Sequence, residues 1–117
     1  EKATSISIDY AVLEKASNVL TIKADIIWDD VGSWNSLPRY KGVNRDNNVL
    51  IGNVITHETY ETTVYNDADG LIACLGVADL VVVRSGDVTM VAHRTQTDKI
   101  KELLAKIADD EKNRKYL

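Results

Sequence analysis

Residues Ile26–Trp34 read Ile-Ile-Trp-Asp-Asp-Val-Gly-Ser-Trp and join an apolar run to two acids, a glycine turn and a second tryptophan. The apolar run predicts a buried strand over Val19–Ile27. In an open α/β sheet, ligands bind outside the carboxyl ends of the strands, where the chain leaves the sheet. An acid at that point can hold a hard cation or a sugar hydroxyl, so this pair of acids is the first candidate for chemistry.

The two acids are not equivalent, because successive side chains of a strand point to opposite faces. Trp28 and Asp30 share one face, and Asp29 faces the other way. One acid of the pair is therefore the candidate for chemistry, and the other is expected in solvent. A structural alternative stays open for Asp30, since an Asp before a glycine-containing turn often accepts a hydrogen bond from its own backbone.

Composition narrows the class of protein. The chain has 117 residues, 44% hydrophobic and 27% charged, which is typical of one ordinary domain or two small pieces. The net charge is −4 and basic residues do not cluster, which argues against a nucleic-acid partner. No run of 18 apolar residues occurs, so no membrane span is expected. Because the chain opens on Glu1 and enters a patterned segment at once, we expect a piece of a longer protein.

Other reactive side chains have ordinary structural explanations. Cys74 stands alone in an apolar run, so we predict a buried structural thiol and a reducing, cytoplasmic setting. His57 and His93 lie far apart, without Cys or Glu at metal-ligand spacing, which argues against a zinc site. The sequence has no Gly-rich phosphate loop and no Ser–His–Asp set that can be assembled.

The first 48 residues combine short helices with one strand. Over Ser5–Ala16 we predict a helix capped by Ser5 or Ser7, with Asp9 in its first turn, where the helix dipole favours an acid. Ser33–Tyr40 is expected to form a second short helix, broken at Pro38. The polar loop Gly42–Asn48 is the best candidate for a boundary between two structural units.

From residue 49 to residue 92 the pattern changes to short apolar runs with polar corners, which predicts tight hairpins or a coiled β-solenoid. The predicted strands are Val49–Ile51, Val54–Ile55, Thr62–Tyr65, Leu71–Leu75, Leu80–Val83 and Val88–Ala92. Gly52 and Gly70 lie between strands, where a sharp corner favours a positive φ. No clean repeat period is visible, so we expect a solenoid that is short and irregular.

A last helix is expected after Thr97, which can cap it. Apolar residues at helical spacing form one stripe along it: Ile100, Leu103, Leu104 and Ile107. Such a stripe is usually core or subunit contact, and it suggests a homodimer. The charged tail after Asp109 is expected to fray.

Four segments, taken in order, resemble mannose-1-phosphate guanylyltransferase: Ser7–Lys15, Trp28–Trp34, Val81–Val88 and Val91–Arg94. The resemblance implies an α+β, β-rich fold. Residues 1–42 would form the tail of a Rossmann-like nucleotidyltransferase domain and residues 43–95 a short, irregular, left-handed β-helix-like region. Residues 96–117 would form a C-terminal amphipathic helix and tail.

The resemblance also implies an activity, the synthesis of GDP-mannose and pyrophosphate from GTP and mannose 1-phosphate with Mg²⁺. The acid of the family's Trp-x-Asp motif is a metal ligand and maps onto Asp30. A cation neutralises charge on both sides of an in-line displacement, and Mg²⁺ takes one or two carboxylates plus phosphate oxygens. Asp9 and Gly32 are the candidate substrate-binding residues.

The chain also departs from the family pattern. Asp29 stands where Ser or Asn is common, which adds repulsion or a second possible metal ligand, and Ile27 stands where Gly is frequent. The family's N-terminal GTP-binding loop and its Glu-Lys-Pro segment are missing, so the chain is expected to be inactive by itself. Two alternatives remain: another sugar-phosphate nucleotidyltransferase, or a non-catalytic β-solenoid assembly module in which Asp30 only caps its turn.

Overall fold

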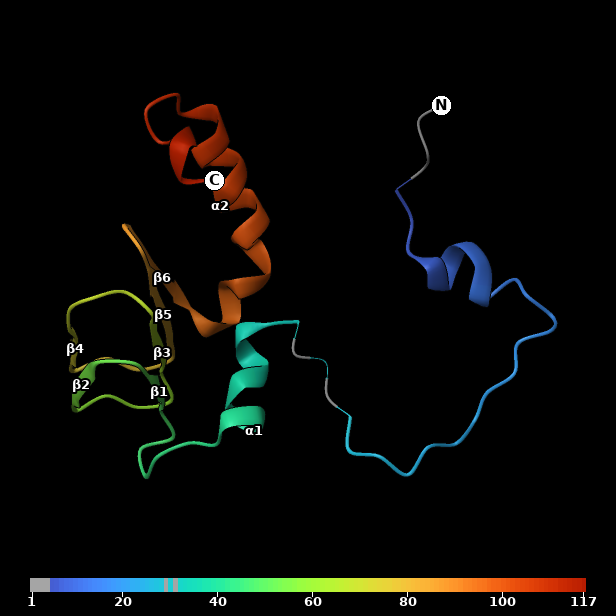
Figure 1. Cartoon of the computed structure of the whole chain (residues 1–117), viewed down its shortest axis with the longest axis horizontal. Helices are drawn as coiled ribbons and strands as arrows, with labels where there is room; N and C mark the ends of the chain where they lie inside the picture. The colour runs from blue at the N-terminus through green and yellow to red at the C-terminus, as the bar shows by residue number, and fades with distance from the viewer. Residues whose placement is uncertain (1–4, 29, 31) are drawn as a thin grey trace.

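A small β-helix forms the centre of the chain in the computed structural model, which describes residues 5–28, 30 and 32–117 (Figure 1). Its strands are β1 (Val49–Ile51), β2 (Val54–His57), β3 (Thr63–Asn66), β4 (Ile72–Leu75), β5 (Leu80–Ser85) and β6 (Val88–His93). Strands β1, β3 and β5 stack in parallel on one side, and β2 and β4 stack in parallel on another. Strand β6 pairs antiparallel with β5 as a hairpin. The predicted strands are confirmed, and the β-rich fold combines coils with one hairpin.

Strand register explains why no repeat period is visible in the sequence. Val49 pairs with Thr63 in the first step of the larger sheet, and Thr63 pairs with Val81 in the next. The first coil is therefore shorter than the second. Gly52 (φ +86°) and Gly70 (φ +111°) occupy corners in the left-handed region, as their positions predict.

The interior of the β-helix is narrow and is filled by small and β-branched side chains. Val64 and Val81 are fully buried, and the buried polar residues include Asn48, Thr62 and Asn66. A coil corner leaves backbone groups without strand partners, and buried backbone groups require hydrogen bonds. The side chains of Asn48 and Asn66 supply these hydrogen bonds at two corners. The core is therefore stabilised by amide hydrogen bonds as well as by apolar contacts.

Short helices flank the β-helix. They are η2 (Trp34–Ser36), α1 (Leu37–Lys41), η3 (Arg94–Lys99), α2 (Ile100–Asp109) and η4 (Arg114–Tyr116). Pro38 was expected to break the second helix, but it lies in the first turn of α1, where the missing N–H costs no helical hydrogen bond. The tail after Asp109 was expected to fray; here it forms η4 and folds back through a hydrogen bond from Arg114 Nε to the Ala108 carbonyl (2.9 Å).

The segment before the β-helix differs most from expectation. The predicted N-terminal helix is reduced to one π-helical turn, η1 (Asp9–Leu13), and the predicted strand Val19–Ile27 has no regular secondary structure. Side chains along it are exposed, with Leu20 at 95% and Ile22 at 92%. The radius of gyration is 18.8 Å, against about 13 Å for a compact domain of this length. A strand needs a neighbouring strand for its backbone hydrogen bonds, and none of the described residues pairs with the segment Val19–Ile27.

Candidate functional site

Asp30 lies where the exposed segment approaches η2. Its carboxylate is exposed and folds back over the following turn, where Oδ1 accepts a hydrogen bond from the Gly32 backbone N–H (3.0 Å). This is the Asx-type turn of the structural alternative, in which an Asp side chain replaces a backbone acceptor. Asp29, the other acid of the pair, lies outside the described residues.

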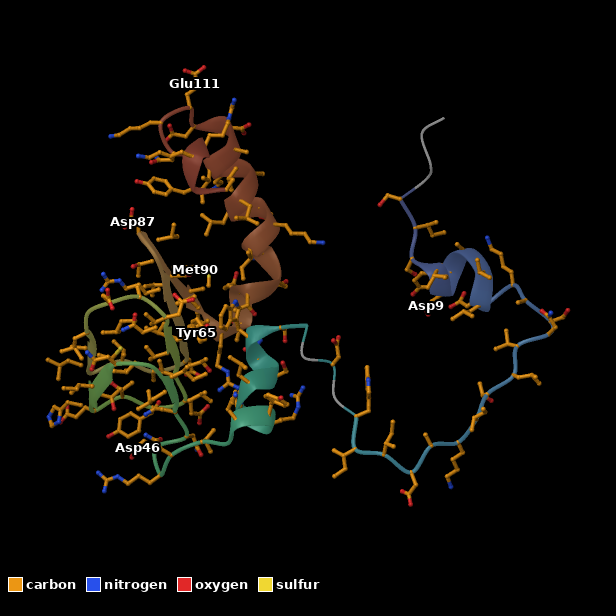
Figure 2. The ribbon with its side chains drawn as sticks, viewed as in Figure 1. Asp9, Asp46, Tyr65, Asp87, Met90 and Glu111 are labelled. Atoms are coloured by element: carbon orange, nitrogen blue, oxygen red, sulfur yellow. The ribbon has the colours of Figure 1, made fainter. Side chains whose placement is uncertain are left out.

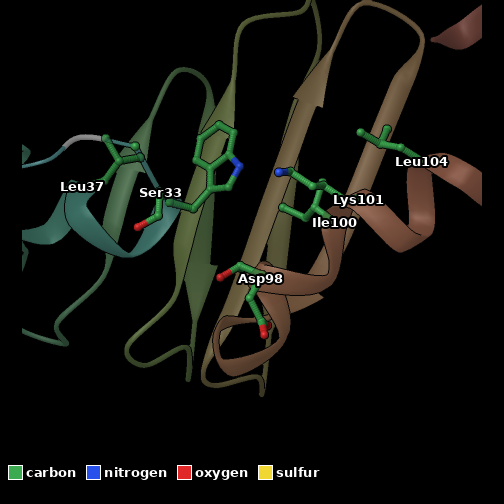
Figure 3. A pocket seen from close by; sticks show the side chains of 9 residues that line it. Ser33, Leu37, Asp98, Ile100, Lys101 and Leu104 are labelled. Carbon is green, nitrogen blue, oxygen red and sulfur yellow. The ribbon is translucent and has the colours of Figure 1, made fainter. Parts of the chain in front are cut away.

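Gly32 lies at the edge of a groove of about 510 Å³. One wall comes from η2 and α1 and the other from η3 and α2 (Figure 3). The lining residues are Gly32, Ser33, Trp34, Leu37, Thr97, Asp98, Ile100, Lys101 and Leu104. We call this the α2 groove. Its lining is largely apolar, with the charged side chains of Asp98 and Lys101 among it.

The walls of the α2 groove are held by contacts between distant parts of the sequence. Asn35 Nδ2 donates to the Arg94 carbonyl (3.0 Å) and to Thr97 Oγ1 (3.2 Å). The Trp34 ring packs against Tyr65 of β3, with ring centroids 5.8 Å apart and planes tilted by 56°. The Asn35 hydrogen bonds tie η2 to η3, and the Trp34 contact ties it to β3, which places one wall of the groove opposite α2.

Thr97 was expected to cap the last helix, and this prediction is wrong. Its hydroxyl donates to the Arg94 carbonyl (3.1 Å) inside η3, and α2 begins later, after Lys99, without a side-chain cap. The capping side chain in this region is His93, whose Nδ1 accepts from the Thr95 backbone N–H (3.3 Å). His93 therefore has the structural role predicted for it, and His57 lies exposed at the end of β2.

Asp9 stands apart from the groove. It is exposed at the start of η1, as Figure 2 shows, and it does not line the α2 groove. Ser5 or Ser7 was expected to cap this helix, but the N-cap position of η1 is Ile8, without a side-chain cap, although Ser7 Oγ accepts from the Tyr10 backbone N–H (3.4 Å). Of the three candidate site residues, the structure brings Asp30 and Gly32 together and leaves Asp9 separate.

The described residues can contribute to a metal site but do not complete one. Among residues 5–28, 30 and 32–117, no group of three or more His, Cys, Asp or Glu side chains could hold an ion. Asp30 offers a hard oxygen donor of the kind that Mg²⁺ accepts, on an exposed side chain. Asp30 could thus supply one ligand, and Mg²⁺ binding would need others.

Cys74 lies half-buried in β4, and burial raises the pKa of its thiol. Because the thiolate is the reactive form, we expect alkylation by iodoacetamide at pH 8 to be roughly three- to tenfold slower than that of glutathione. The rate should keep rising above pH 9. Mass spectrometry of the modified chain measures it, with Cys74→Ser as the blank. A rate equal to that of glutathione at pH 8 would contradict a structural thiol.

None of the helices in the described part of the chain has the length and hydropathy needed to span a bilayer.

Comparison with known proteins identifies relatives over most of the chain. Residues 52–107 match the family described as MannoseP isomerase/GMP-like beta-helix domain. A mannose-1-phosphate guanylyltransferase of Escherichia coli K12 is 38% identical over 104 residues, 89% of this chain and 22% of its own length. The alginate biosynthesis protein AlgA of Pseudomonas aeruginosa is 34% identical over 98 residues, 84% of this chain and 20% of its own length.

A solved structure has the same fold. The crystal structure of a mannose-1-phosphate geranyltransferase from Thermus thermophilus superposes with a TM-score of 0.73 at 36% identity. The match covers 87% of this chain and 31% of that one. The chain thus spans about a fifth of the curated relatives it matches and a third of the solved structure.

Proposed function

We propose that this chain, which is similar to mannose-1-phosphate guanylyltransferases, is the C-terminal part of an enzyme that makes GDP-mannose and pyrophosphate from GTP and mannose 1-phosphate. The observation that carries this proposal is the 38% identity to the Escherichia coli enzyme over 89% of the chain. The β-helix match over residues 52–107 supports it. The enzyme is proposed to work in the cytoplasm.

The proposal assigns each part of the chain a task. Val19–Ile27 would pair in the sheet of the nucleotidyltransferase domain, with the left-handed β-helix attached behind it. Asp30 would hold Mg²⁺, which when bound neutralises charge on the phosphates as pyrophosphate leaves. Gly32 would let the chain turn closely under that carboxylate, since a Cβ there would lie 2.9 Å from Asp30 Oδ1. Gly32 and Asp9 remain the proposed substrate-binding positions.

Asp30→Asn in the full-length enzyme tests the metal role. Asn keeps an oxygen that can accept from Gly32, so the turn is retained and only the charge is lost. We expect turnover to fall at least about a hundredfold, roughly 2.7 kcal/mol, in an assay of GDP-mannose formation. Asp29→Asn is the matched control, because the family commonly has Ser or Asn there, and it should stay within about threefold of wild type. Near-wild-type turnover of a folded Asp30→Asn enzyme would refute the metal role.

The second candidate function is a non-catalytic assembly module, and the Asp30–Gly32 hydrogen bond favours it. In this case Asp30 only shapes the entry to η2, and the apolar stripe of α2 contacts another subunit. A homodimer is compatible with both proposals. A folded Asp30→Asn enzyme with full turnover would support the module.

A further inference from the structure

The α2 groove is apolar and uncovered in this chain. Leu104 lines it and is 45% exposed, while Trp34 and Leu37 form the opposite wall. Apolar side chains gathered in a concave site are typical of surfaces where another body binds. The groove is therefore a candidate interface.

Chain continuity limits where that partner can lie. The groove begins at Gly32, and only residues 29–31 separate it from Trp28 at the end of the exposed apolar segment. Successive Cα atoms are at most about 3.8 Å apart, so Trp28 lies within about 15 Å of the groove's edge in any conformation. A domain that takes Val19–Ile27 as a strand must then stand beside the groove.

Length agrees with such a partner. The curated relatives are between four and five times as long as the match, so they contain a large additional portion. Charge does not select the occupant, because Lys99, Lys101 and Lys106 along this segment are balanced by Asp98, Glu102 and Asp109, all exposed. The choice of occupant therefore depends on chain continuity and length.

We propose that the α2 groove is the interdomain contact of the enzyme, covered by the same nucleotidyltransferase portion that takes Val19–Ile27 into its sheet. This rests on the proposed function. Helix α2 is then the element that couples the β-helix to the catalytic portion, and Leu104 is its central contact. Its neighbour Leu103 is equally exposed, at 45%, but does not line the groove.

The experiment uses the full-length enzyme, in which hydrogen exchange of the α2 backbone amides is measured by mass spectrometry. We expect Leu104→Asp to make this exchange at least tenfold faster than in wild type, whereas Leu103→Asp should leave it within twofold. Exchange in β3 and β5 reports that the β-helix stays folded, and Leu104→Ala replaces the aspartate if it does not.

The outcomes separate this proposal from the proposed function. A full-length protein that makes GDP-mannose, but whose α2 exchange does not respond to Leu104→Asp, overturns the interdomain contact alone. The expected response in a protein that does not make GDP-mannose supports the contact and counts against the proposed function. Equal effects of Leu104→Asp and Leu103→Asp overturn the assignment of the groove. Exchange of α2 in the wild-type protein that becomes faster on dilution identifies a second copy as the occupant and also overturns it.

Discussion

Gly52→Ala is expected to destabilise the β-helix by about 3–6 kcal/mol, enough to unfold much of a marginally stable domain. Gly52 connects β1 to β2 at φ +86°, where an L side chain is strained by about 1–3 kcal/mol. A Cβ there would also overlap the carbonyl oxygen of Asn66 and lie 3.0 Å from its carbonyl carbon. Urea unfolding followed by circular dichroism measures the loss.

The atoms that a Cβ at position 52 would meet belong to the backbone of Asn66, which cannot easily move. Asn66 Nδ2 donates to the carbonyls of Asn53 (3.1 Å) and Gly70 (3.0 Å), which ties this corner to the next coil. Gly76→Ala is the matched control, since Gly76 also has a positive φ (+64°), but a Cβ added to it would meet no heavy atom within 4 Å. It should cost only about 1–2 kcal/mol. Equal losses in the two variants would show that close packing at Gly52 is unimportant.

The β-helix could be predicted from the sequence because its signals are local. Runs such as Leu80–Val83 are rich in β-branched residues and are followed within a few positions by residues that turn easily, so strand and corner are both specified locally. The choice between hairpins and coils could not be made in the same way. It depends on which strands pair, as in Val54 with Ile72. Pairing between residues so far apart in sequence cannot be recognised from the composition of either segment.

The run Val19–Ile27 shows the opposite case. Its composition favours a strand, but strand structure requires a neighbour, and the described chain offers none to it. The α2 groove was missed for a related reason. It depends on Trp34 and Leu104 lying opposite each other, although they are far apart in sequence. The exposed stripe of α2 was the available signal, and it indicated an interface without showing its other wall. The turn at Asp30 was anticipated as an alternative, because that hydrogen bond is local.

Asn48→Ala is expected to cost about 2–5 kcal/mol. The Asn48 side chain is buried, with Nδ2 donating to the Thr59 carbonyl (2.6 Å) and Oδ1 accepting from the Thr62 N–H (2.9 Å). Alanine would leave both backbone groups without these partners inside the coil, at about 1–3 kcal/mol each. Asn44→Ala serves as control, because Asn44 accepts the Asn48 and Asp46 N–H groups at an exposed position. Its loss in urea unfolding should stay below about 1.5 kcal/mol.

Asn48→Asp separates the hydrogen bonds from the volume of the side chain. The ionised carboxylate can still accept from Thr62, but its second oxygen faces the Thr59 carbonyl in place of a donor. Burial and this repulsion should raise the folded-state pKa of the new acid above the unfolded value of about 3.9. Relative to wild type, the deficit in unfolding free energy should therefore be small below about pH 4 and should grow as the pH rises toward the folded-state pKa. A protonated carboxyl can donate to Thr59, which restores the original pattern. If the deficit in unfolding free energy is constant between pH 4 and pH 8, the hydrogen bond donated by Asn48 Nδ2 does not stabilise this corner of the β-helix.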